Sequence, residues 1–384
     1  MIDFRYHLVS LISVFLALAV GIILGAGPLK EAIGDQLSGQ VTSLRTEKEA
    51  LRADLDHAIS TQEGSDGLLT AAAPKALAGA LPSRRVALVL VGDVDDTVVD
   101  STSGYLASAG ATVVSRIQLS EDWFSQAKAD SRQSYASSLS AYLAAGSTTG
   151  GYDATLAHAL VFAFSGYASV EADTFASGAD LTREILTDSG LITTPKAPVA
   201  PADAYVVIEE GSTAAADDAR PTTSPADSAV GTAFAQVLAH DSEGAVVTVT
   251  GRPEGTLVEA VTKDDESNAT VSTVAGVDTV VGQFMVPLAL SERIGGKVGQ
   301  YADTSAASQV PAAAVLEAPD RAALVALGAR DDAATSGDSP DSSKGAETTG
   351  GDTTGGDAAD GDAADGTGDG AAATSGDAAG SSKS

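Results

Sequence analysis

The chain has 384 residues, and its 52 acidic side chains outnumber its 22 basic ones, which gives a formal net charge of −30. Nucleic-acid binding needs a basic surface for the phosphates, so this charge argues against it. Because the sequence contains no cysteine, disulfides, thiolate zinc sites and cysteine nucleophiles are excluded. The length allows roughly two domains of about 150 residues.

The amino-terminal segment from Leu8 to Leu29 contains no charged residue. At about 1.5 Å per residue, a helix of this length reaches about 33 Å, enough to cross a hydrocarbon core of about 30 Å. We therefore expect residues 1–29 to form a transmembrane anchor. The alternative is a cleaved secretory signal, which has a shorter apolar region and small residues at the cleavage site. A cut after Ala26 would place Leu24 where a small residue is needed.

The charges on either side of this segment predict its orientation. Arg5 and the terminal amine precede it, whereas Lys30 is the one basic residue among residues 30–43. Basic residues gather on the cytoplasmic side of a membrane span. We therefore expect a single-pass protein of the cell membrane or envelope, with a cytoplasmic N terminus and its main domain outside the cytoplasm.

Residues 30–63 show the spacing of a coiled coil. Steps of four and three residues connect Leu37, Val41, Leu44, Lys48, Leu51, Leu55 and Ala58. This heptad pattern predicts that the chain forms a homo-oligomer, and a single lysine in the seam tolerates a two-stranded state. The alternative is one amphipathic helix that packs on its own domain. Gly64, Gly67 and Pro74 are expected to end the helix, so that residues 64–83 form a linker.

Residues 84–310 alternate between strand-like and helix-like patterns. The expected strands are Val86–Val91, Ala111–Leu119, Ala204–Ile208 and Ala245–Thr250, and the expected helices cover residues 95–109, 153–164, 170–188 and 228–240. A continuous apolar run is typical of a strand that is buried on both faces. This order predicts an α/β domain with a mostly parallel sheet covered by helices.

Two polar stretches are expected to lack a packed core. Residues 211–226 form a polar insertion between a strand and a helix. Residues 311–384 are expected to be a linker followed by a disordered acidic tail rich in Gly, Ala, Ser and Asp. The last part, residues 331–384, has 12 acidic and 2 basic residues and no large apolar side chain. Such a segment cannot bury enough surface to offset its chain entropy.

One motif raises the question of catalysis. The strand before Asp93, followed by Asp95 and Thr97, is similar to the signature of haloacid dehalogenase phosphatases. In that interpretation Asp93 is the nucleophile, Asp95 is the general acid, and both bind Mg²⁺. The downstream residues that would complete the site, at poor spacing, are Ser165, Lys263, Asp264 and Asp265. We favour a strand-to-helix turn with an aspartate at the helix N terminus, and therefore expect no enzyme and no catalytic or cofactor-binding residue.

Metal ligands are sparse in this sequence. The four histidines are His7, His57, His158 and His240. None of them forms a helical i, i+4 pair, and Met1 and Met285 are the only methionines. Since copper(I) sites prefer clusters of Cys or Met, no copper ligand set is identified. We expect His57 on the exposed face of the coiled coil, and His158 and His240 as packing or surface residues.

A glycine-rich segment from Gly295 to Tyr301 follows the apolar stretch Val280–Leu290. It is not expected to be a phosphate loop, because it lacks the Gly-Lys-Ser/Thr ending and follows a helical run instead of preceding one. We expect a helix C-cap followed by a loop.

Three segments carry a resemblance to a known family. The segments Arg5–Gly25, Gly282–Leu290 and Gly295–Tyr301 resemble MctB, the mycobacterial copper transport protein B family of actinobacteria. The similarity covers residues 1–302, including the order of anchor, coiled coil and α/β domain. It implies an envelope protein, described for the family as an outer-membrane copper transport or efflux protein that keeps intracellular copper low. No metal ligand of the family maps onto a motif here.

Two functions follow from the sequence. The first is a membrane-anchored envelope protein of the MctB copper transport family, which works as an oligomer. The path for copper would then come from the assembly or from an envelope protein partner. The alternative is an envelope scaffold that acts through its coiled coil and tail and has no role with metals.

Overall fold

The structure, a computed structural model, describes residues 4–26, 28–144, 150–170, 173–211, 229–302 and 310–327. By its internal contacts the chain divides into residues 1–337 and residues 338–384, and every described residue belongs to the first of these units. The tail expected over residues 331–384 therefore lies outside the described residues. So does the insertion expected over residues 211–226, apart from Gly211.

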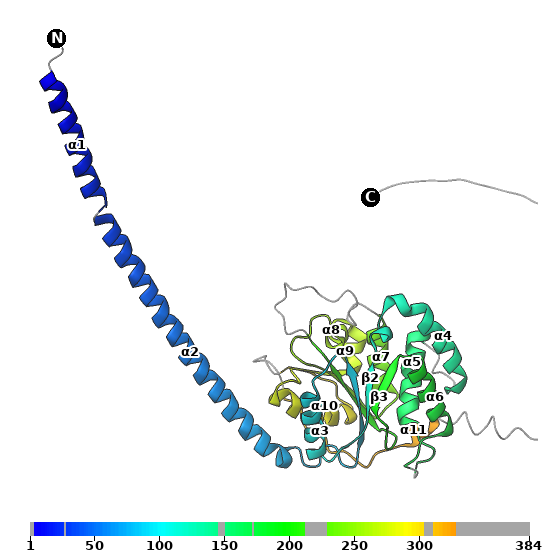
Figure 1. Cartoon of the computed structure of the whole chain (residues 1–384). Coiled ribbons are helices and arrows are strands. Elements are labelled where there is room, and N and C mark those ends of the chain that lie inside the picture. The colour runs from blue at the N-terminus through cyan, green and yellow to red at the C-terminus, as the bar shows by residue number, and fades with distance from the viewer. Residues whose placement is uncertain are drawn as a thin grey trace, which may run out of the picture. The chain divides into compact units, whose positions relative to one another are not determined.

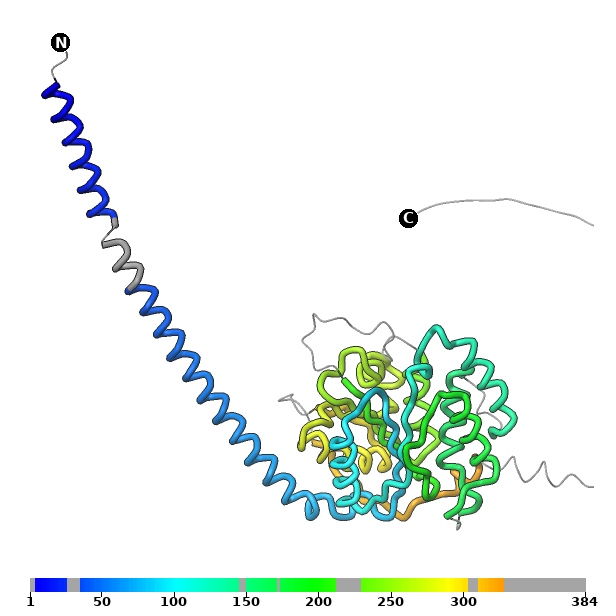
Figure 2. The backbone as a smooth tube through the Cα atoms, in the orientation of Figure 1, coloured from blue at the N-terminus to red at the C-terminus, as the bar shows by residue number. Residues whose placement is uncertain are grey.

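Two helices precede the sheet, α1 (Phe4–Ala26) and α2 (Pro28–Ala76), and Figure 2 traces both. Among the described residues, α1 is the helix with the length and apolar composition needed to cross a membrane. None of the side chains from Phe4 to Gly25 is buried. A helix that is apolar on every side is either buried in a protein core or spans a membrane, and α1 is not buried in the core of this domain.

The structure corrects the expected end of the second helix, because α2 continues through Gly64, Gly67 and Pro74. A glycine inside a helix costs about 1 kcal/mol relative to alanine, and a proline removes one hydrogen bond. These local costs are outweighed by tertiary packing, which supplies most helix stability in proteins. Ala73 and Leu77 are buried in the same hydrophobic cluster as residues of the sheet, so the end of α2 is part of the domain.

The domain is built on a seven-stranded sheet with the order β3-β2-β1-β4-β5-β6-β7. All neighbouring strands are parallel except β3, which pairs antiparallel with β2 at one edge. The strands are β1 (Arg85–Val91), β2 (Thr112–Leu119), β3 (Ile192–Lys196), β4 (Ala204–Glu209), β5 (Ala245–Val249), β6 (Ser272–Ala275) and β7 (Gln300–Ala302). The expected mostly parallel sheet covered by helices is confirmed.

Helices cover both faces of this sheet (Figure 1). On one face α3 and α10 pack together with the end of α2, and on the other lie α4 to α9. The helices are α3 (Asp96–Ser108), α4 (Ala129–Leu139), α5 (Gly151–Ser165), α6 (Ser177–Asp188), α7 (Ala229–His240), α8 (Leu257–Lys263), α9 (Asp265–Thr270), α10 (Val280–Ile294) and α11 (Ala322–Ala326). Short 3-10 helices cover Glu121–Trp123, Gln126–Lys128 and Ser140–Tyr142.

The central strand β1 shows why the sheet needs two covered faces. Its side chains alternate between the two hydrophobic clusters, with Ala87, Val89 and Val91 in one and the even-numbered residues in the other. Trp123, the only tryptophan in the chain, is 1% exposed in the larger cluster. Its ring packs edge-to-face on Phe234, with 5.7 Å between the centroids.

A carboxyl-terminal segment adds to the domain. The sequence predicts that the domain ends at residue 310, whereas residues 310–327 also pack against it in the structure. We call this segment the C-terminal strap. Leu324 of the strap is 2% exposed, and the backbone amide of Ala314 donates to Ser291 Oγ on α10 at 3.1 Å.

Candidate functional site

The order of the strands reverses between β1 and β4, and open α/β sheets bind ligands at the carboxyl ends of the strands at such a point. Here Gly92 and Asp93 follow β1, and Glu209 ends β4 beside Val91. The backbone amide of Asp93 donates to Glu210 Oε2 at 2.8 Å. Gly92 has φ +81°, and a Cβ at this position would lie 2.8 Å from the Cβ of Glu210. These contacts join the turn after β1 to the residue that follows β4.

The aspartates that follow β1 have capping and pairing roles. Asp95 is the N-cap of α3, and its side chain accepts a hydrogen bond from the Thr97 amide at 2.8 Å. This hydrogen bond lowers the pKa of Asp95. Asp96, in the first turn of α3, pairs with Arg116 of β2. The favoured interpretation of this motif as a strand-to-helix turn with an aspartate cap is confirmed.

The residues named for a phosphatase site do not assemble around Asp93. Ser165 is buried at the end of α5, and its hydroxyl lies 2.8 Å from the hydroxyl of Tyr205. Tyr205 pairs with Ala87 near the start of β1, whereas Asp93 lies beyond Val91 at the end of β1. The stretch from Ala87 to Val91 alone spans about 13 Å at the usual rise per residue. Residues 263–265 lie at the junction of α8 and α9, where Asp264 caps α9.

A buried carboxyl group at the end of β4 was missed by the sequence analysis. Glu209 is 3% exposed, and burial raises its pKa to about 8. The backbone amide of Leu257 donates to Glu209 Oε2 at 2.6 Å, which ties the start of α8 to the sheet. The signal that could have found it is a glutamate that directly continues the apolar run Ala204–Ile208.

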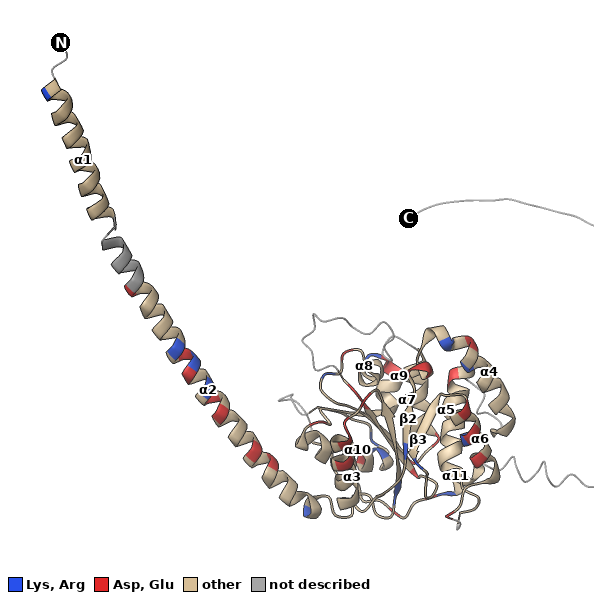
Figure 3. Cartoon of the chain, in the orientation of Figure 1, with Lys and Arg blue, Asp and Glu red and all other residues tan. Residues whose placement is uncertain are grey.

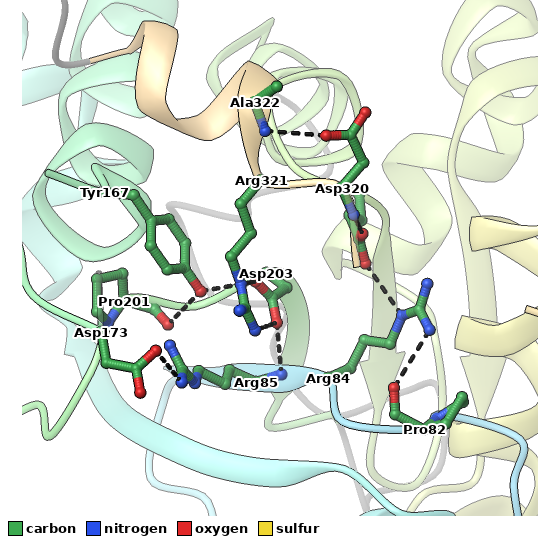
Figure 4. A network of polar contacts seen from close by, with 11 residues as sticks. Pro82, Arg84, Arg85, Tyr167, Asp173, Pro201, Asp203, Asp320, Arg321 and Ala322 are labelled. Carbon is green, nitrogen blue, oxygen red and sulfur yellow. Dashed lines mark hydrogen bonds and ion pairs between the residues drawn. The ribbon is translucent and has the colours of Figure 1, made fainter. Parts of the chain in front are cut away.

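A polar network at the amino ends of the central strands centres on Asp203, the fully buried residue before β4 (Figure 4). Its carboxylate accepts hydrogen bonds from the Arg85 amide at 2.9 Å, from the Tyr167 hydroxyl at 2.6 Å and from Arg321 Nε at 2.9 Å. Burial and the nearby carboxylate raise the pKa of Tyr167. The hydrogen bond with Asp203 raises the pKa of Arg321, so Tyr167 remains neutral and Arg321 charged.

A second part of this network forms hydrogen bonds with the C-terminal strap (Figure 4). Arg84 is 3% exposed, and it donates to the Glu317 carbonyl at 2.5 Å and pairs with Glu243 at 3.1 Å. Glu243 also accepts a hydrogen bond from the Asp320 amide at 2.9 Å. Burial raises the pKa of Glu243, although the charge of Arg84 acts in the opposite direction. The network therefore has a structural role, holding the strap on the domain.

The structure brings two of the four histidines to one carboxylate. Nδ1 of His158 contacts Asp241 Oδ2, and Nδ1 of His240 lies 2.8 Å from Asp241 Oδ1. Burial would raise the pKa of Asp241, but the hydrogen bonds with both rings outweigh it and lower the pKa. His7 and His57 are exposed on α1 and α2. In the described ranges, no group of three or more His, Asp or Glu side chains is arranged to hold a metal ion.

The remaining candidates have structural roles. Met285 is 3% exposed in the core between α10 and the sheet. The helix α10 ends at Gly295, whose amide donates to the Ser291 carbonyl at 3.0 Å, and Gly296 follows with φ +87°. The expected helix C-cap is confirmed, but the loop is shorter than expected, because Gln300 and Tyr301 belong to the edge strand β7 and pair with β6.

Comparison with known proteins shows the family. Residues 1–312 match the family described as "Copper transport outer membrane protein, MctB". The chain belongs to the MctB family. Similar relatives are the proteins named "Copper transporter MctB" of Mycobacterium bovis and Mycobacterium tuberculosis. Each is 28% identical over 318 residues, which covers 78% of this chain and 96% of the relative.

The family match confirms the resemblance inferred from the sequence motifs, and it includes both α1 and the sheet. The family description and the apolar helix α1 together support a location in the membrane or envelope. Arg321, which binds Asp203 from the strap, lies beyond the 312 matched residues.

Proposed function

We propose that this protein is anchored in the cell envelope by α1 and exports copper, so that intracellular copper stays low. The observation that carries this proposal is the match to a copper transport family over residues 1–312. The match spans the anchor, α2 and nearly all of the α/β domain. The relatives named as copper transporters are covered over 96% of their length, so the proposal rests on a likeness of almost the whole protein.

The anchoring is supported by the surface of α1. Its side chains from Phe4 to Gly25 are all outside the core of the domain, and an apolar surface of this size is unfavourable in water. A bilayer covers such a surface, and a helix satisfies its own backbone hydrogen bonds there. The helix α2 begins at Pro28, so α1 joins it after Gly27 alone. We propose that α1 is retained as an anchor.

We propose that the N terminus lies in the cytoplasm and the α/β domain outside it, and the basic residues that flank α1 support this orientation. The chain has no cysteine, so a single introduced thiol reports its own side of the membrane. Asp188→Cys, on the exposed face of α6, is expected to react with a membrane-impermeant maleimide on spheroplasts. Asp3→Cys, before the anchor, is expected to react only after permeabilisation. The reverse labelling pattern would overturn this orientation.

The path for copper is proposed to lie in an assembly of several chains or in a complex with another envelope protein. This follows from the chemistry of the described residues, which contain no metal-holding cluster of His, Asp or Glu. The many carboxylates of a chain with net charge −30 attract cations without selecting copper.

The test is the copper content of a strain that lacks the gene, grown in sublethal copper beside its parent and a complemented strain. We expect higher intracellular copper in the deletion strain and parental copper after complementation with the full chain. Equal copper in the three strains would overturn the efflux role. The envelope scaffold without a metal role would then become the leading hypothesis.

A further inference from the structure

The helix α2 presents an apolar stripe that no other described part of the chain covers. Every described side chain from residue 35 to residue 65 is exposed. The exposed fractions lie between 42% and 63% for Leu37, Val41, Leu44, Leu51, Leu55 and Ile59. Contacts with the domain begin further along, where Thr70 Oγ1 lies 3.2 Å from the hydroxyl of Tyr105. Since most helix stability in proteins comes from tertiary packing, this stretch needs a partner surface.

We infer that the partner is a second copy of this chain, and that the two helices form a parallel, two-stranded coiled coil. The seam consists of Leu37, Val41, Leu44, Lys48, Leu51, Leu55 and Ala58. In heptad terms, Val41, Lys48 and Leu55 occupy a positions and the others occupy d positions. A β-branched residue at a, leucine at d and a single lysine at a are features that favour two strands and fix the register.

The shape of α2 agrees with this register. A shallow groove on the helix is lined by Leu44, Glu47, Lys48, Leu51, Arg52 and Leu55. In a coiled coil each core side chain enters a hole formed by four residues of the facing helix. In a parallel pair, the hole for the partner's residue 48 is formed by residues 44, 47, 48 and 51. The hole for the partner's residue 51 is formed by residues 48, 51, 52 and 55, so the groove consists of two consecutive holes.

The charges beside the seam select the parallel direction. Basic and acidic side chains alternate along the middle of α2 (Figure 3). Glu47 occupies a g position and Arg52 the e position five residues later, and these two positions face each other across a parallel pair. Each dimer then contains two such ion pairs. In an antiparallel pair g faces g and e faces e, so that glutamate would meet glutamate and arginine would meet arginine.

The inference does not depend on copper transport, because the stripe, the groove and the charges belong to α2 alone. Anchoring by α1 adds to it, since two copies in one membrane point in the same direction at a raised local concentration. A coiled coil of three heptads is short, and this added concentration favours pairing of a weak interface.

Disulfide trapping tests the pairing directly, because the chain has no cysteine of its own. Ala58→Cys is placed at a d position in the seam, and Ala53→Cys at the f position on the opposite face of the same exposed stretch. We expect mild iodine oxidation of membranes carrying the full chain to convert Ala58→Cys to a covalent dimer and to leave Ala53→Cys as a monomer. Equal trapping of both variants, or trapping of neither, would overturn the parallel pairing.

Charge reversal in the Ala58→Cys background tests the direction and the register. Glu47→Arg or Arg52→Glu alone replaces two attractions by two repulsions and is expected to lower the dimer association constant about tenfold. The double variant restores the pairs and the dimer, and co-expression of the two single variants yields mainly the mixed dimer. Glu49→Arg, at a b position away from the seam, is the matched control. A loss with the control equal to that with Glu47→Arg, or no recovery in the double variant, would overturn the proposed register. A mass of three or more chains in detergent would overturn the two-stranded state.

Discussion

Replacing Glu209 with glutamine is expected to remove a pH-dependent loss of stability from the α/β domain. Burial raises the pKa of this carboxyl from its usual 4.5 to about 8, so the folded state retains a proton that the unfolded chain releases. Stability therefore falls as pH rises between these two values, by about 1.4 kcal/mol per pH unit. Between pH 5.5 and pH 7.5 the loss from Glu209 is about 2–3 kcal/mol, which corresponds to about 5–10 °C in the melting temperature of a domain of this size.

Glutamine has nearly the same shape and remains neutral, and its carbonyl can accept the hydrogen bond that the Leu257 amide donates to Glu209 Oε2. The free energy of unfolding of Glu209→Gln is thus expected to exceed that of the parent by an amount that widens by about 2–3 kcal/mol from pH 5.5 to pH 7.5. The assay is urea unfolding of the full chain in a non-ionic detergent. Fluorescence of Trp123, the only tryptophan and 1% exposed, reports the domain without interference from α1 or α2.

Glu210→Gln is the matched control, because the neighbouring Glu210 side chain is exposed and Oε1 of glutamine also accepts a hydrogen bond from the Asp93 amide. Its curve of stability against pH is expected to run parallel to that of the parent. If Glu209→Gln also runs parallel to the parent, the carboxyl of Glu209 titrates normally and the argument from its burial is refuted.

Three further substitutions test the contacts that hold the domain together, each by urea unfolding followed at Trp123. Asp203→Asn leaves the Arg321 charge without its partner and is expected to cost about 3–5 kcal/mol. Lys263→Ala, which removes an exposed lysine that pairs with Glu259 on α8, is expected to cost less than about 1 kcal/mol. Leu77→Ala removes a fully buried side chain after α2 and is expected to cost about 2–5 kcal/mol. Leu68→Ala, 75% exposed on α2, is expected to change stability by less than about 0.5 kcal/mol. Asp241→Asn weakens the hydrogen bonds with both histidine rings and is expected to cost about 1–3 kcal/mol at pH 7. The Asp203 network would not stabilise the domain if Asp203→Asn cost no more than Lys263→Ala. Equal costs for the two leucine variants would contradict the packing of Leu77. An unchanged unfolding curve for Asp241→Asn would contradict the role of its hydrogen bonds with the two histidines.

The central strands could be predicted from the sequence because their signal is local. The run Val86–Val91 is short, rich in valine and apolar throughout, as is typical of a strand with both faces covered. The aspartate cap of α3 was also predictable, since Asp95 directly precedes the helix and a cap needs no distant partner. By contrast, β6 and β7 have four and three residues, too few for a period of two to stand out.

The polar contacts of the domain could not be predicted, because they join residues far apart in the sequence. Asp203 and Arg321 are separated by 118 positions, and His158 meets Asp241 across 83 positions. The end of α2 was mispredicted for the same reason. Local propensity disfavours helix at Gly64 and Pro74, and the burial of Leu77, which favours it, depends on strands that come later in the chain.

The C-terminal strap packs on the α/β domain but lies mostly beyond the residues that match the family. Its contacts with Arg84 and Asp203 join it to the amino ends of strands β1 and β4. Residues 313–327 of the strap lie beyond the matched residues. The α/β domain thus packs against the end of α2 on one face of the sheet and against the strap at the amino ends of the strands. Pairing of two copies through α2 would bring two such domains together outside the membrane.

We propose copper export by an envelope-anchored protein, and the rate of copper loss from preloaded cells measures this export. Cells lacking the gene, cells complemented with the full chain, and cells that secrete residues 28–384 behind a cleavable signal are loaded with copper and moved to copper-free medium. Intracellular copper is then followed over time by mass spectrometry. We expect slow loss in the deletion strain, parental loss with the full chain, and slow loss with the released form. Equal rates in all three strains would show that the protein does not export copper.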